Sequence, residues 1–288
     1  MLVFPNAKIN LGLRVIAKRF DGFHNIETVF YPVGLCDALE AIPASDGVFE
    51  FTSSGLPVPG NPADNLCVRA CQLLNPSIAK ALTENALPGF IPIGPSSGLP
   101  PVKVHLHKVI PIGSGLGGGS SDGAWMLKLL NDLFVLGLTS RQLQDNARQL
   151  GSDCAFFIEN KPVLACEKGD RFLPLGSGLP DLHVALVIPD IHCNTTDAYA
   201  AIVPARPLVS IARAIGFPVE KWKNDLINDF EAPVFRSYPE IEMIKEKLYK
   251  AGAVYASLTG SGAAVFGIFS KIPNLENLFP GCFTWSHR

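Results

Sequence analysis

The twelve residues from Pro111 to Asp122 carry the clearest chemical signal in the sequence, because five of them are glycine. Glycine weakens helices and strands alike, so packing does not explain such a run. It leaves a bare backbone whose N–H groups can converge on an anion. An apolar segment with helical spacing begins at Ala124, and Ser120 and Ser121 are expected at its N-cap. Amide donors at a helix start bind phosphate, so the sequence predicts a phosphate-binding loop.

The surroundings of this loop narrow its type. Gly113, Gly115 and Gly118 match the G-x-G-x-x-G pattern of dinucleotide-binding folds. Residues 102–107 alternate apolar and polar, however, which is typical of an antiparallel strand with one wet face and not of a Rossmann strand. No Lys-Ser/Thr pair closes the loop, and the protein-kinase motifs V-A-I-K, H-R-D and D-F-G are absent. A flexible glycine linker is disfavoured, because linkers do not lead into an apolar helix.

Three further residues are candidates for chemistry, and each has a structural alternative. Lys8 lies on an expected strand over residues 4–16, where a lone lysine is normally a solvated or edge charge. His24 follows the Asp21-Gly22 turn and, taken alone, is more typical of a structural hydrogen bond. Asp153 stands between a helix end and an apolar segment. It is either the N-cap of a short helix or a carboxylate tuned by a dry cleft.

The elements that position these residues are read from periodicity and turn signals. Residues 86–101, rich in proline and glycine, predict a surface loop. Strands are expected over residues 4–16, 26–41, 102–110, 163–166, 182–188, 254–258 and 263–269, and helices after residue 65, after the glycine loop, and over 140–150, 195–203, 208–215 and 240–251. Thr139 and Gln142 form a capping box. This order predicts an α+β fold with largely antiparallel sheets and a domain break near residue 160.

Bulk composition excludes several classes of protein. The 288 residues are 48% hydrophobic and 17% charged, which is ample for the cores of two modest domains. A formal net charge of −2 gives no electrostatic footprint for nucleic acid or an anionic membrane. No apolar run approaches membrane-spanning length, and the N-terminus lacks the features of a signal peptide. The 7 scattered cysteines are expected to be buried thiols. We therefore expect a cytoplasmic protein without nucleic-acid or membrane partners.

Five motifs, taken together in order and spacing, resemble the GHMP superfamily of small-molecule kinases. They are P-N-A-K-I-N-L at 5–11, D-G-F-H at 21–24, the glycine-serine loop at 111–121, L-G-S-D at 150–153 and T-G-S-G-A-A-V-F at 259–266. The resemblance implies an α+β, two-domain GHMP kinase fold with the active site between the domains. A ribosomal protein S5 domain 2-like N-terminal domain, 1–160, would carry the ATP loop. A ferredoxin-like C-terminal domain, 161–288, would complete the substrate cleft.

The same resemblance implies roles for individual residues. Lys8 and Asp153 would take the catalytic positions. ATP would lie over the loop, with its adenine or ribose near two further residues. The implied ATP-binding residues are Pro111, Ile112, Gly113, Ser114, Gly115, Leu116, Gly117, Gly118, Gly119, Ser120 and Ser121, together with Asn65 and Lys103.

The N-terminal motifs narrow the resemblance to members whose substrate is linked to cytidine diphosphate. It implies ATP-dependent phosphorylation of the 2-hydroxyl of a cytidine-diphosphate-linked methylerythritol, in the non-mevalonate isoprenoid precursor pathway. Asn10 would hold the sugar alcohol, and His24 would hydrogen-bond the cytosine. The base would stack on Phe23, where the family usually has tyrosine, with Tyr199 as the opposite wall and Thr195 four residues before it.

The implied chemistry suits these residue types. Asp153 would accept the proton of the substrate hydroxyl, and Lys8 would pair with it and offset charge on the transferring phosphoryl group. Mg²⁺ would arrive with ATP, with Ser120 or Ser121 as its nearest protein contact, and no tightly bound cofactor is expected. The chain is expected to be a monomer or a weak homodimer. Two alternatives remain: another GHMP kinase, acting on homoserine, mevalonate or a sugar, and a non-catalytic nucleotide-binding module.

Overall fold

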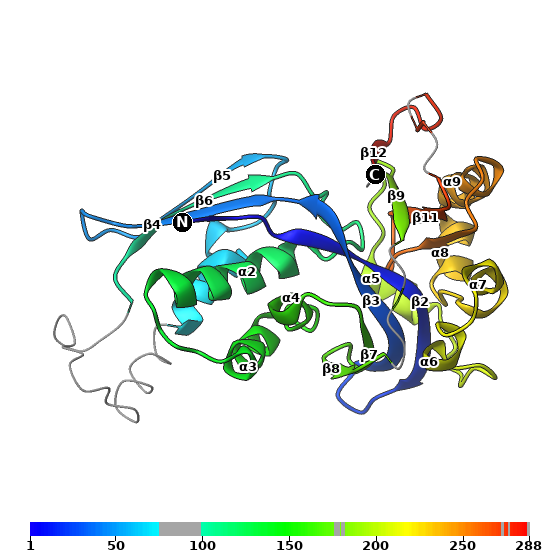
Figure 1. Ribbon diagram of the computed structural model, residues 1–288, viewed down its shortest axis with the longest axis horizontal. Coiled ribbons are helices and arrows are strands. Elements are labelled where there is room, and N and C mark those ends of the chain that lie inside the picture. The colour runs from blue at the N-terminus through cyan, green and yellow to red at the C-terminus, as the bar shows by residue number, and fades with distance from the viewer. Residues whose placement is uncertain (75–98, 176–178, 180–181, 272–273, 276, 287–288) are drawn as a thin grey trace. The chain divides into compact units, whose positions relative to one another are not determined.

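The two longest strands, β2 (Asn6–Lys18) and β3 (His24–Cys36), carry the N-terminal motifs into a sheet with residues from the second half of the chain. Figure 1 shows the chain as a computed structural model. It describes residues 1–74, 99–175, 179, 182–271, 274–275 and 277–286. Among these residues no helix is both long and apolar enough to cross a membrane.

The chain divides into two compact units that are not continuous in sequence. Unit 1 comprises residues 1–6, 36–110 and 118–160, and unit 2 comprises residues 7–35, 111–117 and 161–288. The division after residue 160 coincides with the expected boundary. The expected N-terminal domain of 1–160 nevertheless differs from unit 1, because the strands of 7–35 and the glycine loop belong to unit 2. The reason is hydrogen bonding: β3 pairs antiparallel with β7 (Val163–Glu167), which holds the N-terminal strands to the later half.

Unit 1 is built on a sheet with the strand order β1-β4-β6-β5, in which only the β5–β6 pair is parallel. Along β6, Val102, Val104 and Leu106 are buried and alternate with polar residues, as the sequence predicts. Helix α2 packs against this sheet and also against α3 and α4 (Figure 1). The elements are β1 (Leu2–Val3), β4 (Ala38–Pro43), β5 (Glu50–Gly55), η1 (Pro62–Asp64), β6 (Val102–Lys108), α2 (Gly118–Leu133), α3 (Ser140–Leu150) and α4 (Phe156–Glu159), with a helix at 66–74.

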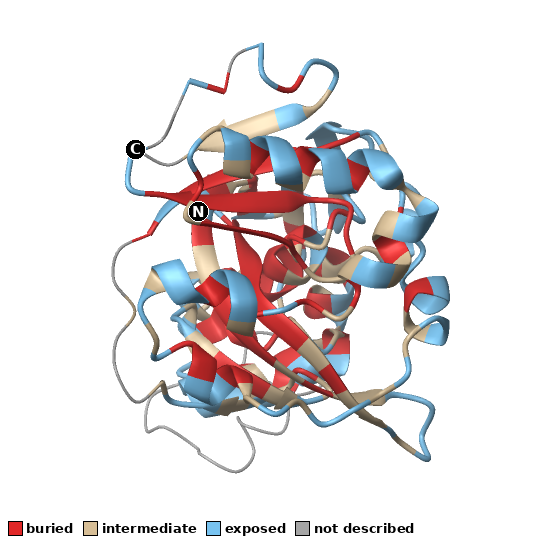
Figure 2. Ribbon diagram, turned by 90° about the vertical axis from the view of Figure 1, so that its right-hand side faces the viewer, coloured by how far each residue is buried: buried red, intermediate tan, exposed pale blue. Residues whose placement is uncertain are grey.

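Unit 2 contains two sheets, with the strand orders β2-β3-β7-β8 and β10-β11-β9-β12. Helix α9 packs on β10 and β11 with Ile241, Ile244 and Leu248 buried on one face. In Figure 2 other helices likewise have a buried side, drawn in red, and an exposed side, drawn in pale blue. The remaining elements are β8 (Arg171–Leu173), β9 (His183–Ile188), α5 (Thr195–Ala200), α6 (Ile211–Ala214), α7 (Val219–Asp225), α8 (Glu231–Ser237), α9 (Pro239–Lys250), β10 (Tyr255–Leu258), β11 (Val265–Phe269) and β12 (Phe283–Ser286).

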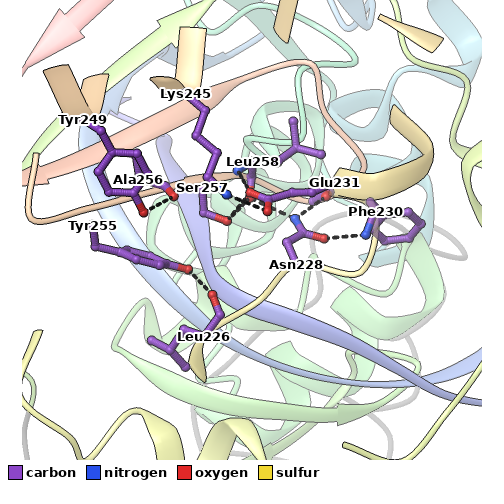
Figure 3. Close-up of polar contacts among 11 residues, drawn as sticks. Leu226, Asn228, Phe230, Glu231, Lys245, Tyr249, Tyr255, Ala256, Ser257 and Leu258 are labelled. Atoms are coloured by element: carbon purple, nitrogen blue, oxygen red, sulfur yellow. Dashed lines mark hydrogen bonds and ion pairs between the residues drawn. The ribbon is translucent and has the colours of Figure 1, made fainter. Parts of the chain in front are cut away.

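A buried polar network fixes the end of β10 (Figure 3). The Asn228 side chain donates to the carbonyl oxygens of Leu258 and Gly260, both at 2.9 Å. The Glu231 carboxylate accepts from the Leu258 N–H at 3.0 Å and pairs with Lys245 at 2.7 Å. These contacts hold the backbone on both sides of residue 259, so the turn that follows β10 has a fixed geometry.

Most expected elements are confirmed, and the differences have identifiable causes. The capping box at Thr139 is confirmed, with both of its hydrogen bonds present, and α3 ends at Leu150 as expected. The strand expected over 26–41 is two strands in different sheets, separated at Asp37. The backbone N–H of Asp37 bonds to Pro5, and its carboxylate accepts two further amides. The loop expected over 86–101 lies, up to residue 98, outside the described residues.

Candidate functional site

The glycine-rich loop, residues 111–117, contains three glycines in a backbone conformation that other residues rarely adopt. The φ angles of Gly113, Gly115 and Gly117 are +70°, +82° and +72°. At Gly115 space is also restricted, because a Cβ there would lie 2.1 Å from the carbonyl oxygen of Thr259. Both conformation and space therefore require glycine at position 115.

Carbonyl groups of this loop are hydrogen-bonded, whereas its amides are not. The Lys8 N–H donates to the carbonyl of Leu116 at 2.9 Å, and the Ala264 N–H donates to that of Ser114 at 3.0 Å. No amide of residues 112–117 donates a hydrogen bond within the part of the chain that the structure describes. Converging backbone N–H groups of this kind bind anions. The loop therefore has the features of a phosphate site.

The loop leads directly into α2, which begins at Gly118. Ser120 and Ser121 lie inside the first turn, so the expected N-cap position for these serines is wrong. Helical conformation begins directly after Gly117, the last residue of the loop with a positive φ. The first N–H groups of a helix have no partner within it, so this 16-residue helix adds donors and a positive dipole end.

The other loop residues divide between the inside and the surface. Leu116 is fully buried, while Ile112 is 45% exposed. The Ser114 hydroxyl donates to the carbonyl of Pro111 at 2.6 Å, which stabilises the turn itself. Gly119 is exposed at the start of α2, with nothing within 4 Å of a Cβ placed there. The exposed part of this stretch is therefore the part where backbone amides are accessible.

The Lys8 side chain is held beside the loop by neutral oxygen atoms. Its Nζ donates to Asn10 Oδ1 at 2.8 Å and to the carbonyl of Gly115 at 3.0 Å. Asn10 donates in turn to Thr28 Oγ1 at 3.0 Å, and Thr259 Oγ1 donates to Asn10 Oδ1 at 3.2 Å. These contacts fix the position of the ammonium group beside the loop.

Asn10, expected to hold the sugar alcohol, is only 1% exposed. Both atoms of its side-chain amide are bonded inside the protein, and one of these bonds orients Lys8. The structure therefore gives Asn10 a positioning contact, and its contact with a substrate stays a prediction.

A second buried lysine lies at the end of β6, before the loop. Lys108 is 2% exposed, and its Nζ pairs with the carboxylates of Asp37 and Asp122, the latter at 2.7 Å. The other Asp37 oxygen accepts the N–H groups of Val109 at 2.6 Å and Ile110 at 2.8 Å. We call Lys108, Asp37 and Asp122 the stem cluster, because it joins residues on both sides of the loop.

Burial and neighbouring charges shift the pKa values of Asp122 and Lys108. It raises the pKa of Asp122 to about 8, although the Lys108 ammonium acts in the opposite direction. Burial alone lowers the pKa of Lys108, but the charges of Asp122 and Asp37 outweigh it, and the pKa is raised. The second oxygen of Asp122 is buried with no hydrogen-bond partner among the described residues.

Of the residues expected to bind a base, two are in direct contact. His24 and Tyr199 stack directly, with ring centroids 4.7 Å apart and an interplanar angle of 14°. Tyr199 thus faces His24, whereas the expectation set it opposite Phe23. Phe23 is 57% exposed, with the Lys168 ammonium 5.3 Å from its ring centroid. The Thr195 hydroxyl lies at the start of α5, 2.9 Å from that of Ser261. Burial, and then Lys18, lower the pKa of His24.

Three other expected site residues have different surroundings. Asp153 is half-buried in the turn before α4, and the N-cap of that helix is Ala155, so the capping alternative for Asp153 is wrong. The Asn65 side chain accepts the Cys67 N–H at 2.9 Å, a helix-capping contact. Lys103 pairs with Asp46 at 2.7 Å on the surface. For Asn65 and Lys103 the structure thus shows local structural contacts, and contact with ATP stays a prediction.

Three residues near the loop were not predicted from the sequence. Lys108 occupies a core-facing position of the alternating strand β6, and a buried ionisable residue in such a position requires a partner; that signal was available. Thr259 was noted only as part of the T-G-S-G motif, and its contact with Asn10 was not predicted. The exposed His192 lies close to Gly113, where a Cβ would be 3.0 Å from its Nδ1. Nothing in the local sequence indicates that contact.

Models of two protein families match the chain. The GHMP kinases N terminal domain matches residues 71–161, and the GHMP kinases C terminal domain matches residues 219–277. The first match includes the glycine loop and Asp153, and the second includes the T-G-S-G turn.

Similar proteins match over nearly the whole length. The chain is 48% identical to a 4-diphosphocytidyl-2-C-methyl-D-erythritol kinase of Cytophaga hutchinsonii over 95% of the chain and 94% of that protein. It is 45% identical to that of Parabacteroides distasonis over 99% and 98%. A crystal structure of 4-(cytidine 5'-diphospho)-2C-methyl-D-erythritol kinase aligns with a TM-score of 0.78 at 29% identity, over 99% and 98% of the two chains. The mevalonate kinase of Methanococcus jannaschii, at 15% identity and a TM-score of 0.68, shares the fold.

Proposed function

The chain belongs to the GHMP kinase family, an α+β family with N- and C-terminal domains, and we propose that it phosphorylates the 2-hydroxyl of 4-diphosphocytidyl-2-C-methyl-D-erythritol with ATP. This reaction is a step of the non-mevalonate isoprenoid precursor pathway. Relatives named for that activity match at 45% and 48% identity over almost the whole chain, which supports this substrate over mevalonate or homoserine.

The observation that carries the proposal is the chemistry of the glycine loop. Its amides have no hydrogen-bond partner among the described residues, while carbonyls of Ser114, Gly115 and Leu116 accept hydrogen bonds from the rest of unit 2. A polyphosphate placed on this loop gains N–H donors that are already in position, so binding requires little reorganisation. The start of α2 adds further donors.

The catalytic roles follow from residue type and surroundings. Asp153 accepts the proton of the substrate hydroxyl as it attacks the γ-phosphorus, and such general-base catalysis contributes ~10²–10⁴-fold. Lys8 stabilises the negative charge on the transferring phosphoryl group. The hydrogen bonds from Lys8 Nζ to Asn10 and Gly115 support that role, because they fix the ammonium beside the loop.

Mg²⁺ would bind together with ATP. It neutralises phosphate charge when bound, and it keeps most of its waters and takes few protein ligands. Among the described residues no group of three His, Cys, Asp or Glu side chains could hold a metal ion. The Ser120 hydroxyl, half-buried in the first turn of α2, is the protein group that would contact it.

The base pocket is formed by Phe23, His24 and Tyr199. The stacked pair of His24 and Tyr199 presents aromatic surface and ring nitrogens in one place, as recognition of a nucleobase requires. The exposed ring of Phe23 supplies a further stacking face. Asn10 and Thr195 complete the implied set of substrate-binding residues, and Asn65 and Lys103 complete that for ATP.

The proposal also covers the roles of the two domains, the location of the protein and its oligomeric state. The two functional domains are residues 1–160, with the ATP loop, and residues 161–288, which complete the substrate site. The protein acts in the cytoplasm as a monomer or a weak homodimer, with no nucleic-acid or membrane partner. The formal net charge of −2 and the seven free cysteines of the described chain support this setting.

The test is a substrate competition with the purified protein and Mg·ATP. ADP release and product mass are measured with 4-diphosphocytidyl-2-C-methyl-D-erythritol, mevalonate, homoserine and galactose. We expect phosphorylation of the first compound alone and competitive inhibition by cytidine nucleotides. Turnover of one of the others, with no effect of cytidine nucleotides, would refute this substrate and leave the kinase assignment standing.

A further inference from the structure

The glycine loop has little stiffness of its own. Three of its glycines have φ angles between +70° and +82°, and glycine has more accessible backbone conformations than any other residue. Amide donors stabilise a phosphate best when they are held in place before the ligand arrives. The residues on either side of the loop, together with the hydrogen bonds that its carbonyls accept, must therefore set its geometry.

The stem cluster joins these two sides. Before the loop, one oxygen of Asp37 accepts the N–H groups of Val109 and Ile110, at 2.6 and 2.8 Å. After the loop, Asp122 in the first turns of α2 accepts from Lys108 Nζ at 2.7 Å. The second oxygen of Asp37 accepts from the same Nζ. A continuous chain of side-chain contacts thus runs from the entry of the loop to its exit.

Burial makes this connection rigid. Asp37, Lys108 and Asp122 are 1%, 2% and 3% exposed. Polar groups in such a place cannot exchange their partners for water, so Asp37 and Asp122 each depend on the lysine. The cluster is also close-packed against the helix start, because a Cβ at Gly118 would lie 3.0 Å from Lys108 Nζ.

We propose that the stem cluster of Lys108, Asp37 and Asp122 is a positioning device for ATP, which fixes the two ends of the glycine loop so that its amides are arranged before ATP binds. The three residues do not touch the nucleotide; they act through the backbone of residues 109–110 and 118–122. The inference rests on the proposed function for the identity of the ligand. It predicts that weakening the cluster lowers affinity for ATP and leaves affinity for the cytidine substrate unchanged.

The central experiment compares two changes at one position. Asp122→Ala removes the contact with Lys108, whereas Asp122→Asn keeps the volume and an oxygen that can accept from Nζ. By calorimetry with a non-hydrolysable ATP analogue and Mg²⁺, we expect Asp122→Ala to raise Kd at least tenfold. Asp122→Asn should recover most of that loss. Kd for 4-diphosphocytidyl-2-C-methyl-D-erythritol should stay within twofold in both variants.

The matched control removes an ion pair of similar length far along the chain from the loop. Arg14→Met breaks the pair with Asp229, which is 2.8 Å long. We expect it to lower Tm and to leave Kd for the ATP analogue unchanged. If Asp122→Ala behaves like this control, with a lower Tm and an unchanged Kd, the cluster is structural only and the proposal is overturned.

A measurement on the unaltered protein covers the case in which Asp122→Ala does not fold. Without nucleotide, the amides of Val109 and Ile110 should exchange hydrogen as slowly as the most protected amides of α2. Fast local exchange at both would show that the loop ends are not fixed in advance, and would overturn the proposal. If the unaltered protein fails to bind the ATP analogue at all, the proposed function fails, and this inference with it.

Discussion

The two buried lysines, Lys8 and Lys108, are matched in burial and differ in their partners. They are 3% and 2% exposed. Lys8 Nζ donates to the neutral oxygens of Asn10 and Gly115, whereas Lys108 Nζ pairs with the carboxylates of Asp37 and Asp122. Both stand next to the glycine-rich stretch, one in unit 2 and one in unit 1.

The difference in partners separates two uses of the same side chain. Carboxylates compensate the charge of Lys108, so its contribution is to structure, and removing it leaves buried acids behind. Hydrogen bonds to Asn10 and Gly115 orient the Lys8 ammonium beside the loop, where it can act on an anion. We therefore expect Lys8 to contribute to the chemistry and Lys108 to the architecture of the loop.

The largest effect is expected from a parallel comparison of two carboxylates. Asp153→Asn should reduce kcat by at least ~10²-fold, the contribution of a general base, with little change in Tm. Asp37→Asn should lower Tm and change kcat less, because an amide group beside Lys108 destabilises the stem cluster. Steady-state kinetics and thermal unfolding of both variants check this. A near-normal kcat for Asp153→Asn would contradict its assigned role.

The next effect concerns the glycine-rich loop. Gly115→Ala places a Cβ 2.1 Å from the Thr259 carbonyl at a φ of +82°, so the loop must move and ATP affinity should fall more than tenfold. Gly137→Ala is the control, because its φ of +69° gives similar strain while nothing lies within 4 Å of the Cβ. Equal ATP affinities in the two variants would show that the loop tolerates displacement.

A smaller effect is expected at the residues proposed to bind the base. Stacking of a base on an aromatic ring is worth ~1–3 kcal/mol. Phe23→Ala and Tyr199→Ala should therefore each raise KM for the cytidine substrate about tenfold, since 1.4 kcal/mol is a factor of ten. His24→Ala should cost more, because it also removes a hydrogen-bonding group, and should weaken discrimination against uridine analogues. KM for ATP should stay constant; a rise in it would place these residues elsewhere.

The smallest effect is a pH dependence at His24. Burial and Lys18 lower its pKa below 6.5, so the fold favours the neutral ring. The contribution of His24 to stability is then complete above pH 6.5 and is lost as pH falls through the lowered pKa. An NMR titration of the ring should give a midpoint below 6.5, and KM for the cytidine substrate should be flat between pH 8 and 7. A midpoint above 6.5 would contradict the stacked arrangement.

The sequence predicted local features well, because their causes are local. The alternation along β6 and the capping box of α3 follow from neighbouring residues and are confirmed. Features that depend on distant contacts were not predicted. Thr259 bonds to Asn10 across 249 positions, and Asp37 bonds to Lys108 across 71. Neither pairing leaves a periodic signal, so only the folded chain reveals it.

The contacts among the candidate site residues were predicted only in part. Lys8 and the loop do lie together, as the resemblance implies, and His24 lies against Tyr199. Asn10 was expected to face a substrate, yet it is 1% exposed and bonded to Lys8. A short polar side chain on a strand gives no indication of whether solvent or another polar group will face it.

The most direct test is a single-turnover measurement of phosphoryl transfer in Lys8→Met and Lys108→Met, at saturating ATP and 4-diphosphocytidyl-2-C-methyl-D-erythritol. We predict that Lys8→Met slows the transfer step at least ~10²-fold, as loss of one preorganised charge-stabilising group does. Lys108→Met should transfer phosphate within about tenfold of the unaltered rate once ATP is saturating, with its defect confined to ATP affinity and Tm. Equal slowing in both variants, or a normal rate in Lys8→Met, would contradict the assignment of one lysine to chemistry and the other to architecture.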